Sequence, residues 1–215
     1  MLSLVLPRLY VILDAALTRE PAAKIARQLL DAGVRLLQYR AKSEPARETL
    51  DVAKQLAELA HRKGATFFVN DRPDLAYLAG ADGVHVGQED LSVEQARTIV
   101  GRERRVGVST HNREQFERAL ATSADYIAIG PIYSTTSKTN PDPVVGVELV
   151  RELRSLTTKP IVAIGGIRLE RATEVIQAGA DSVAVIGDIL GAPDPALQTR
   201  RFIETLETAK PAAHL

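Results

Sequence analysis

Residues 161–187 read IVAIGGIRLERATEVIQAGADSVAVIG and contain one complete strand–helix–strand unit. Two short, mainly apolar runs at 161–164 and 182–185 flank a segment at 169–178 in which apolar residues recur at helical spacing. Short strands without polar alternation are typical of parallel sheets that are covered by helices on both faces. This stretch therefore predicts a parallel α/β protein.

The same alternation extends along the rest of the chain. In residues 50–60, for example, the apolar side chains keep the three- and four-residue spacing of one helical face. The remaining predicted strands are 9–13, 34–38, 66–69, 83–86, 106–108 and 126–129. The remaining predicted helices are 22–30, 50–60, 73–78, 93–100, a segment through Phe116 and Leu120, 147–156 and 196–207.

Eight strand–helix units in 215 residues predict one domain, a single (β/α)8 TIM barrel that spans residues 1–215. A weak internal repeat favours a closed barrel over an open sheet, because a small residue repeatedly ends a helix and the chain then turns into a strand. The repeat occurs at 31–34, 79–84, 122–127 and 178–183. Such turns are common in α/β proteins, so the repeat supports the barrel without deciding it.

The composition excludes several classes of function. Lys and Arg together number 27, as do Asp and Glu, and a balanced charge argues against a protein that coats nucleic acid or an anionic membrane. There is no cysteine, so disulfides and thiolate metal sites are excluded. The apolar start, residues 1–6, is too short for a signal peptide or a membrane span. We expect a cytoplasmic protein, a monomer or small homo-oligomer, with small-molecule substrates.

Unusual polar residues follow the predicted strands at one end of the barrel. Active sites of such barrels lie at the C-terminal ends of the strands, so these residues are the candidates for chemistry. Gln38, Arg40 and Lys42 alternate along an extended segment, so their side chains can point the same way. Two cations beside an amide suit a polyanion and a polar ring. The alternative is a solvated strand end.

Asp71 and Asp90 follow two neighbouring predicted strands, with Asn70 directly before Asp71. Two carboxylates without any thiol suit Mg²⁺ that is shared with a phosphate ester. Helix capping is the competing interpretation, above all for Asp90.

Glycines end the last two predicted strands, at Gly165–Gly166 and at Gly187 after Ile186. The loops after strands seven and eight, with the N-terminus of a short extra helix, form the recurrent phosphate site of these barrels. Glycine lets backbone N–H groups approach phosphate oxygens closely. A tight turn would explain glycine in one such loop, but glycine in both loops favours phosphate.

A long loop at 133–145 is rich in Ser, Thr and Pro and carries Lys138, which suits a lid that closes over an anion. His85 and His111 are as consistent with a barrel lining as with catalysis. No catalytic triad, glutamate pair or dinucleotide-binding glycine motif is present. The remaining inventory describes an enzyme that handles one diphosphate and one monophosphate.

Seven motifs together resemble the thiamine phosphate synthases over nearly the whole chain. Each motif is weak alone, but the ensemble and its order are specific. The motifs are QYRAK at 38–42, VND at 69–71, GVHVGQED at 83–90, GVSTH at 107–111, GPIY at 130–133, TTSK at 135–138 and IGGI at 164–167.

The resemblance implies a magnesium-dependent transferase. It would join 4-amino-5-hydroxymethyl-2-methylpyrimidine diphosphate to hydroxyethylthiazole phosphate, or its carboxylated form, and release pyrophosphate. Asp71 and Asp90 would hold Mg²⁺, while Arg40, Ser109 and Lys138 would act at the leaving group. The pyrimidine diphosphate would contact Gln38, Arg40, Lys42, Asn70, Ser109 and Lys138. The thiazole phosphate would contact Thr135, Thr136, Ser137, Gly166, Ile186 and Gly187.

Two positions depart from the pattern of many relatives. Ser137 stands where many have Thr and keeps the hydroxyl, whereas Gly187 stands where many have Ser and keeps only the backbone N–H. Two other functions remain open. A thiazole tautomerase-like isomerase would keep the glycine loops but need neither the Asp pair nor Lys138. A non-catalytic phosphate-metabolite-binding protein would bind without turnover.

Overall fold

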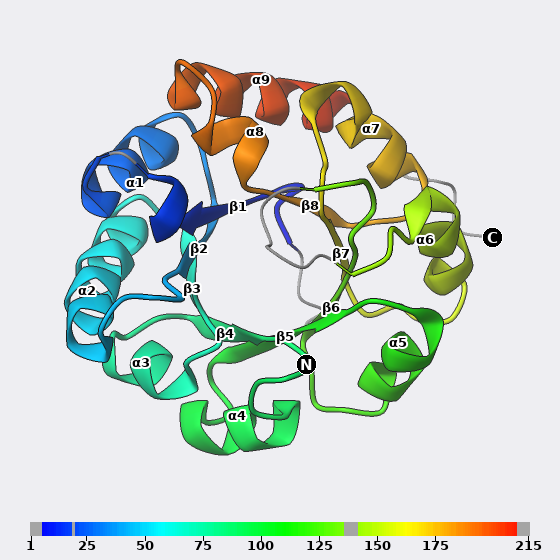
Figure 1. Ribbon diagram of the computed structural model, residues 1–215, viewed down its shortest axis with the longest axis horizontal. Coiled ribbons are helices and arrows are strands. Elements are labelled where there is room, and N and C mark those ends of the chain that lie inside the picture. The colour runs from blue at the N-terminus through cyan, green and yellow to red at the C-terminus, as the bar shows by residue number, and fades with distance from the viewer. Residues whose placement is uncertain (1–5, 19, 136–141, 210–215) are drawn as a thin grey trace.

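The computed structural model describes residues 6–18, 20–135 and 142–209. Eight strands form a closed ring in the order β1 to β8, and helices surround them (Figure 1). All neighbouring strands are parallel, and β1 closes the ring against β8 with Leu9 opposite Val183. The predicted (β/α)8 TIM barrel is confirmed.

The element bounds lie within two residues of the predicted ones, except that the second helix begins at Ala46 and not at residue 50. The second strand is shifted by two residues to 36–40. The strands are β1 Leu9–Asp14, β2 Leu36–Arg40, β3 Thr66–Asn70, β4 Gly83–Val86, β5 Arg105–Thr110, β6 Tyr126–Ile129, β7 Ile161–Ile164 and β8 Ser182–Val185. The helices are η1 Ala15–Leu17, α1 Ala22–Asp31, α2 Ala46–Arg62, α3 Pro73–Leu78, α4 Val93–Val100, α5 Arg113–Leu120, α6 Gly146–Arg154, α7 Leu169–Gln177, α8 Gly187–Leu190 and α9 Pro195–Thr208.

Two boundaries bear on the site. Strand β5 continues to Thr110, so Ser109 lies within the strand, opposite Ala128 of β6, and does not follow the strand as expected. The extra helix α8 begins at Gly187, directly after β8. The sheet thereby fixes Ser109, while the loop after β8 has the short extra helix that the fold rule predicts.

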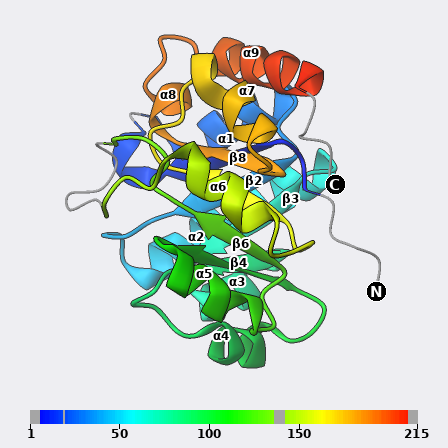
Figure 2. The ribbon, with the colours of Figure 1, turned by 90° about the vertical axis from the view of Figure 1, so that its right-hand side faces the viewer.

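The core has two layers, one between the strands and the helices and one inside the barrel. Figure 2 shows helices α5, α6 and α7 along one side of the barrel. The rings of Tyr10, Phe68 and Tyr126 meet edge to face inside it, with centroids 5.7–6.1 Å apart. Glycine at position 107 makes room for this packing, because a Cβ there would lie 2.0 Å from Cζ of Tyr126.

The internal repeat has a structural role at the N-terminal ends of the strands. Asp82, Asp125 and Asp181 each enter a strand, and each carboxylate accepts a hydrogen bond from a backbone N–H of the preceding strand at 2.7–2.8 Å. These contacts join neighbouring strands at the end away from the glycine loops after β7 and β8. The repeat is therefore a feature of barrel stability.

No helix in the described ranges is long and apolar enough to cross a membrane.

Candidate active site

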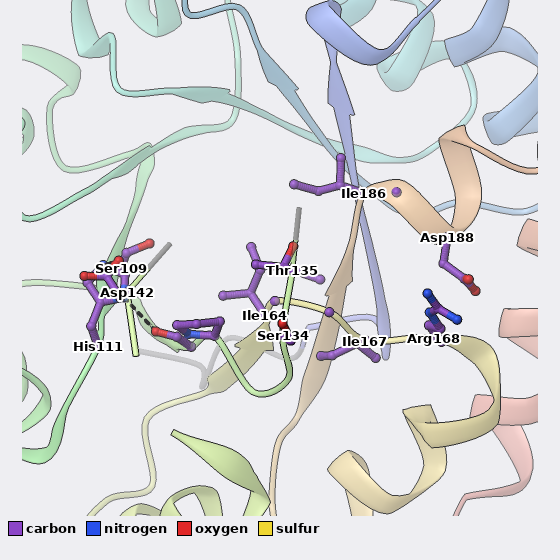
Figure 3. Close-up of a pocket in the computed structure, with 16 residues that line it drawn as sticks. Ser109, His111, Ser134, Thr135, Asp142, Ile164, Ile167, Arg168, Ile186 and Asp188 are labelled. Atoms are coloured by element: carbon purple, nitrogen blue, oxygen red, sulfur yellow. Dashed lines mark hydrogen bonds and ion pairs between the residues drawn. The ribbon is translucent and has the colours of Figure 1, made fainter. Parts of the chain in front are cut away.

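A pocket of about 560 Å³ opens at the C-terminal ends of β5 to β8. Figure 3 shows Ser109, His111 and Asp142 on one side of it and Arg168 and Asp188 on the other. Both apolar and polar groups contribute to its walls, as in sites that bind a ring with a charged substituent. The lining residues are Ser109, His111, Gly130, Pro131, Ser134, Thr135, Asp142, residues 164–168, Ala184 and residues 186–188.

The glycine pair after β7 brings two loops together. Gly166 has a φ of 64°, in the left-handed region that favours glycine. A Cβ on Gly166 would lie 2.3 Å from the carbonyl oxygen of Ser134 and 2.7 Å from that of Tyr133. Two features therefore require glycine at position 166, namely the close approach of the loop after β6 and the left-handed backbone conformation. Both loops then form one continuous wall of the pocket.

The loop after β8 passes directly into the one-turn helix α8. Ile186 and Gly187 line the pocket, as expected of a phosphate loop. The helix is tied to its neighbours by Asp188, whose carboxylate accepts hydrogen bonds from the backbone N–H of Leu169 at 3.2 Å and from Gln198 at 2.9 Å. These bonds fix the first turn of α8 relative to α7 and α9.

Gln38 and Arg40 lie within β2 and do not follow the strand as expected, whereas Lys42 comes after it. The alternative of a solvated strand end is wrong for the first two residues, while the Lys42 side chain is half exposed. Gln38 is only 1% exposed and donates a hydrogen bond to the Tyr10 hydroxyl at 2.7 Å. Arg40 forms an ion pair with Asp14, and Lys42 lies 2.5 Å from a carboxylate oxygen of Asp71. The Gln38 amide therefore lies inside the barrel. Arg40 and Lys42 lie at the rim of the barrel, each beside an acidic residue.

The structure brings the two predicted metal ligands together. Asp71 lies at φ 61°, and its N–H donates to the His85 carbonyl at 2.7 Å, which fixes the turn after β3. Asp90 accepts a hydrogen bond from the N–H of Gly87 at 2.8 Å. The cap of α4 is Ser92, so the capping interpretation of Asp90 is wrong.

The pKa of Asp90 is raised above its usual value by burial, and then by hydrogen bonding and charge repulsion from Asp71. The positive charge of Lys42 lowers the pKa of Asp90 but does not cancel this rise. Within the described ranges, no group of three or more His, Cys, Asp or Glu side chains forms a metal cage. Magnesium does not need one, since it commonly takes one or two carboxylates together with phosphate oxygens and water.

Both histidines have defined partners. His85 contacts the Tyr126 hydroxyl through Nδ1 at 2.9 Å and the Ser109 hydroxyl through Nε2 at 2.8 Å. His111 donates from Nδ1 to the Gly130 carbonyl at 2.6 Å, and its Nε2 lies 3.5 Å from Asp142. His111 thus lines the pocket, whereas His85 lies behind Ser109.

The other candidates are placed as follows. Asn70 ends β3 opposite His85, and Thr135 lines the pocket. Thr136, Ser137 and Lys138 lie outside the described residues. Sequence reasoning missed Asp14, although an acidic residue directly after the first predicted strand was a usable signal. It also missed Tyr10, Tyr126, Asp142, Arg168 and Asp188, of which the two tyrosines looked like ordinary strand core.

A family model described as thiamine monophosphate synthase matches residues 9–189, which include all eight strands and the glycine loops. The chain belongs to this family. Thiamine-phosphate synthase from Koribacter versatilis is 51% identical over 208 residues, covering 94% of this chain and 97% of the relative. Thiamine-phosphate synthase from Gloeobacter violaceus is 44% identical over 183 residues, covering 85% of this chain and 53% of that longer relative.

A solved structure, thiamine phosphate pyrophosphorylase from Pyrococcus furiosus, is 33% identical with a TM-score of 0.86, and the match covers 94% of this chain and 96% of that one. The family, the fold and the enzyme class inferred from the sequence are therefore confirmed. The thiamine monophosphate synthase family consists of transferases of thiamine biosynthesis.

Proposed function

We propose that the chain condenses 4-amino-5-hydroxymethyl-2-methylpyrimidine diphosphate with hydroxyethylthiazole phosphate, or its carboxylated form, to give thiamine phosphate and pyrophosphate. One observation carries the proposal. The rim of the barrel has two distinct polar regions, a carboxylate pair with cations after β1 to β4 and a glycine-walled pocket after β5 to β8. Two phosphorylated substrates need two such regions.

The carboxylate pair fits magnesium. Asp71 and Asp90 lie in contact, and burial together with repulsion from Asp71 raises the pKa of Asp90 even though the Lys42 cation lies nearby. In this proposal these two side chains hold Mg²⁺ with the diphosphate. The metal supplies charge neutralisation on the departing pyrophosphate.

The chain's own groups complete the diphosphate region. Arg40 and Lys42 are charged groups at the rim, and Gln38 and Asn70 offer amide contacts beside them. In the reaction the bond between the pyrimidine methylene and the diphosphate oxygen breaks, and pyrophosphate leaves with the electron pair. The thiazole nitrogen then donates its electron pair to form the new C–N bond. Arg40, Ser109 and Lys138 stabilise the charge that develops on the leaving group.

The glycine-walled pocket receives the thiazole phosphate. Thr135, Thr136 and Ser137 provide hydroxyl groups, and backbone N–H groups at Gly166, Ile186 and Gly187 provide donors for the phosphate. The loop that carries Lys138 excludes water from the cation formed in the first step. This division requires no general base, in agreement with the lack of a catalytic triad in the sequence.

The competing functions require less of this site. A thiazole tautomerase-like isomerase has no need of the Asp71–Asp90 pair, and a phosphate-metabolite-binding protein has no turnover. We further propose that the enzyme acts in the cytoplasm as a monomer or small homo-oligomer, on small molecules and without nucleic acid or membrane partners.

The deciding experiment mixes the purified protein with both substrates and Mg²⁺ and measures pyrophosphate and thiamine phosphate. Equal amounts of both products support the proposal, and no pyrophosphate release rejects it. Lys138→Ala is then expected to lower kcat far more than it weakens binding of the thiazole phosphate. An equal loss in kcat and in affinity for the thiazole phosphate would contradict a role for Lys138 at the leaving group.

A further inference from the structure

A continuous chain of hydrogen bonds runs through the interior of the barrel. Gln38 Nε2 donates to the Tyr10 hydroxyl at 2.7 Å, and the hydroxyl groups of Tyr10 and Tyr126 are 3.1 Å apart. Tyr126 continues to His85 Nδ1 at 2.9 Å, and His85 Nε2 reaches the Ser109 hydroxyl at 2.8 Å. Ser109 lines the pocket, so this series of hydrogen bonds ends at the candidate active site.

The members of this chain lie deep in the protein. Tyr10 and Tyr126 are at most 1% exposed, and His85 is 8% exposed. Burial raises the pKa of both tyrosines well above the ordinary value, so each keeps its single hydroxyl hydrogen. The His85 ring stacks on Tyr126 with an interplanar angle of 24° and a centroid distance of 5.5 Å. Packing therefore restricts the orientation of the imidazole.

One direction of donation follows from the orientation of the Gln38 amide in the structure. Its Nε2 donates to the Tyr10 hydroxyl, while its buried Oε1 has no hydrogen-bond partner among the described residues. The other contact described for the Tyr10 hydroxyl is Tyr126, which must accept the Tyr10 hydrogen or leave it buried without an acceptor. Tyr126 then donates its own hydrogen to Nδ1 of His85. A neutral imidazole that accepts at Nδ1 carries its hydrogen on Nε2 and donates it to Ser109.

We infer that Tyr10, Tyr126 and His85 are positioning residues that make the Ser109 hydroxyl a hydrogen-bond donor toward the pocket. Because Ser109 accepts from His85, its own hydrogen is free for a ligand oxygen. Resting on the function proposed above, that oxygen belongs to the departing pyrophosphate. The simpler interpretation is that these buried polar groups only satisfy one another. It requires neither a fixed direction of hydrogen-bond donation nor an effect on Ser109.

The tautomer of His85 tests the direction without measuring activity. In the full-length protein with ¹⁵N-labelled histidine, long-range ¹H–¹⁵N spectra at neutral pH should show His85 protonated at Nε2 and not at Nδ1. Loss of the signal in His85→Gln assigns it, or its shift in Tyr126→Phe does so if that variant does not fold. A hydrogen on Nδ1, alone or together with one on Nε2, would overturn the inference.

Kinetics test the link to Ser109. Tyr126→Phe keeps the ring but removes the donor to His85, so the imidazole can take the other tautomer and accept the Ser109 hydrogen. We expect kcat to fall roughly 10-fold, the value for one charge-assisted hydrogen bond, with KM for the thiazole phosphate unchanged. Tyr39→Phe, which removes a hydroxyl from a buried strand tyrosine outside the chain, should stay within about 2-fold.

The double variant Ser109→Ala/Tyr126→Phe separates positioning from general damage. If Tyr126 acts through Ser109, the double variant is no slower than Ser109→Ala. Losses that multiply would show that Tyr126 acts by another route and would overturn the inference. If the wild-type protein releases no pyrophosphate, the proposed function is wrong. The His85 tautomer alone then decides whether the hydrogen bonds donate from Gln38 toward Ser109.

Discussion

Asp14 and Arg40 are opposite one another at the ends of β1 and β2, and their side chains form a nearly buried ion pair. The Asp14 side chain is 3% exposed and that of Arg40 is 19% exposed. The carboxylate also accepts a hydrogen bond from the N–H of Ala16 at 3.0 Å, which begins η1. The first strand thus positions a cation that is carried by the second.

Asp14→Asn should weaken the diphosphate region. The amide retains the contact to Ala16 but leaves the Arg40 guanidinium without a partner charge, so its position is less well defined. We expect about a 10-fold lower kcat/KM for the pyrimidine diphosphate and a loss of about 3 kcal/mol in the free energy of unfolding. Enzyme kinetics and urea unfolding measure these effects.

Asp31→Asn is the matched control, because Asp31 pairs with Lys63 on an exposed surface and should contribute little. If Asp14→Asn leaves both kinetics and unfolding unchanged, the ion pair does not hold Arg40 for binding.

Asp90→Asn should stabilise the metal-free protein. The pKa of Asp90 is raised in the folded protein, so the protonated Asp90 side chain stabilises the fold. This contribution is complete at pH values below the pKa of the unfolded chain and is lost as the pH rises through the folded-state pKa. Asparagine remains neutral and keeps that contribution. At pH 7 without metal we expect Tm to rise by roughly 1–3 °C, and the difference should vanish near pH 3.

With magnesium bound, the wild-type protein should be more stable than Asp90→Asn. Magnesium should raise the Tm of the wild-type protein but not that of Asp90→Asn, and EDTA should abolish the rise. Asp51→Asn, on the exposed face of α2, is the control and should alter neither Tm nor the magnesium effect. An equal response of Asp90→Asn and wild type to Mg²⁺ would argue against Asp90 as a ligand.

Gly166→Ala should disrupt the thiazole phosphate region. Its Cβ would approach the Ser134 carbonyl to 2.3 Å, so the loops after β6 and β7 must separate. Gly64→Ala is a close control, since Gly64 has a φ of 66° but nothing lies within 4 Å of a Cβ there. The control should lose about 1 kcal/mol from backbone strain alone.

Unfolding measurements and thiazole phosphate titrations distinguish the two variants. We expect Gly166→Ala to be less stable than Gly64→Ala and to bind the phosphate at least about 10-fold more weakly. Equal stability and unchanged binding would mean that the two loops adapt without consequence for the site.

Gly187→Ser should improve phosphate binding. Position 187 begins α8 and lines the pocket, so a serine hydroxyl would add one donor beside the backbone N–H. We expect KM for the thiazole phosphate to fall by about 3- to 10-fold, the value of one hydrogen bond, with kcat little changed. Gly187→Ala adds the Cβ without the hydroxyl and should not lower KM; an equal fall in both variants would exclude the hydroxyl as the cause.

Much of the barrel followed from local patterns. Apolar strands such as Ile161–Ile164 and helical faces such as residues 50–60 depend on neighbours in the chain, and a rule of chain geometry places the polar residues at one end. The position of Asp71 and Asp90 at that end was therefore predictable. Their contact was not, because it depends on the turn in which Asp71 adopts φ 61°.

The sequence by itself determined the eight units, the family and the set of polar residues at the strand ends, since each depends on residue types and their order. Only the tertiary structure decided which of those residues meet. Asp14 holds Arg40 because β1 and β2 pair in that register, and Ser92 rather than Asp90 caps α4. Tyr10 and Tyr126, 116 residues apart, meet because the closed ring turns their side chains into one small interior.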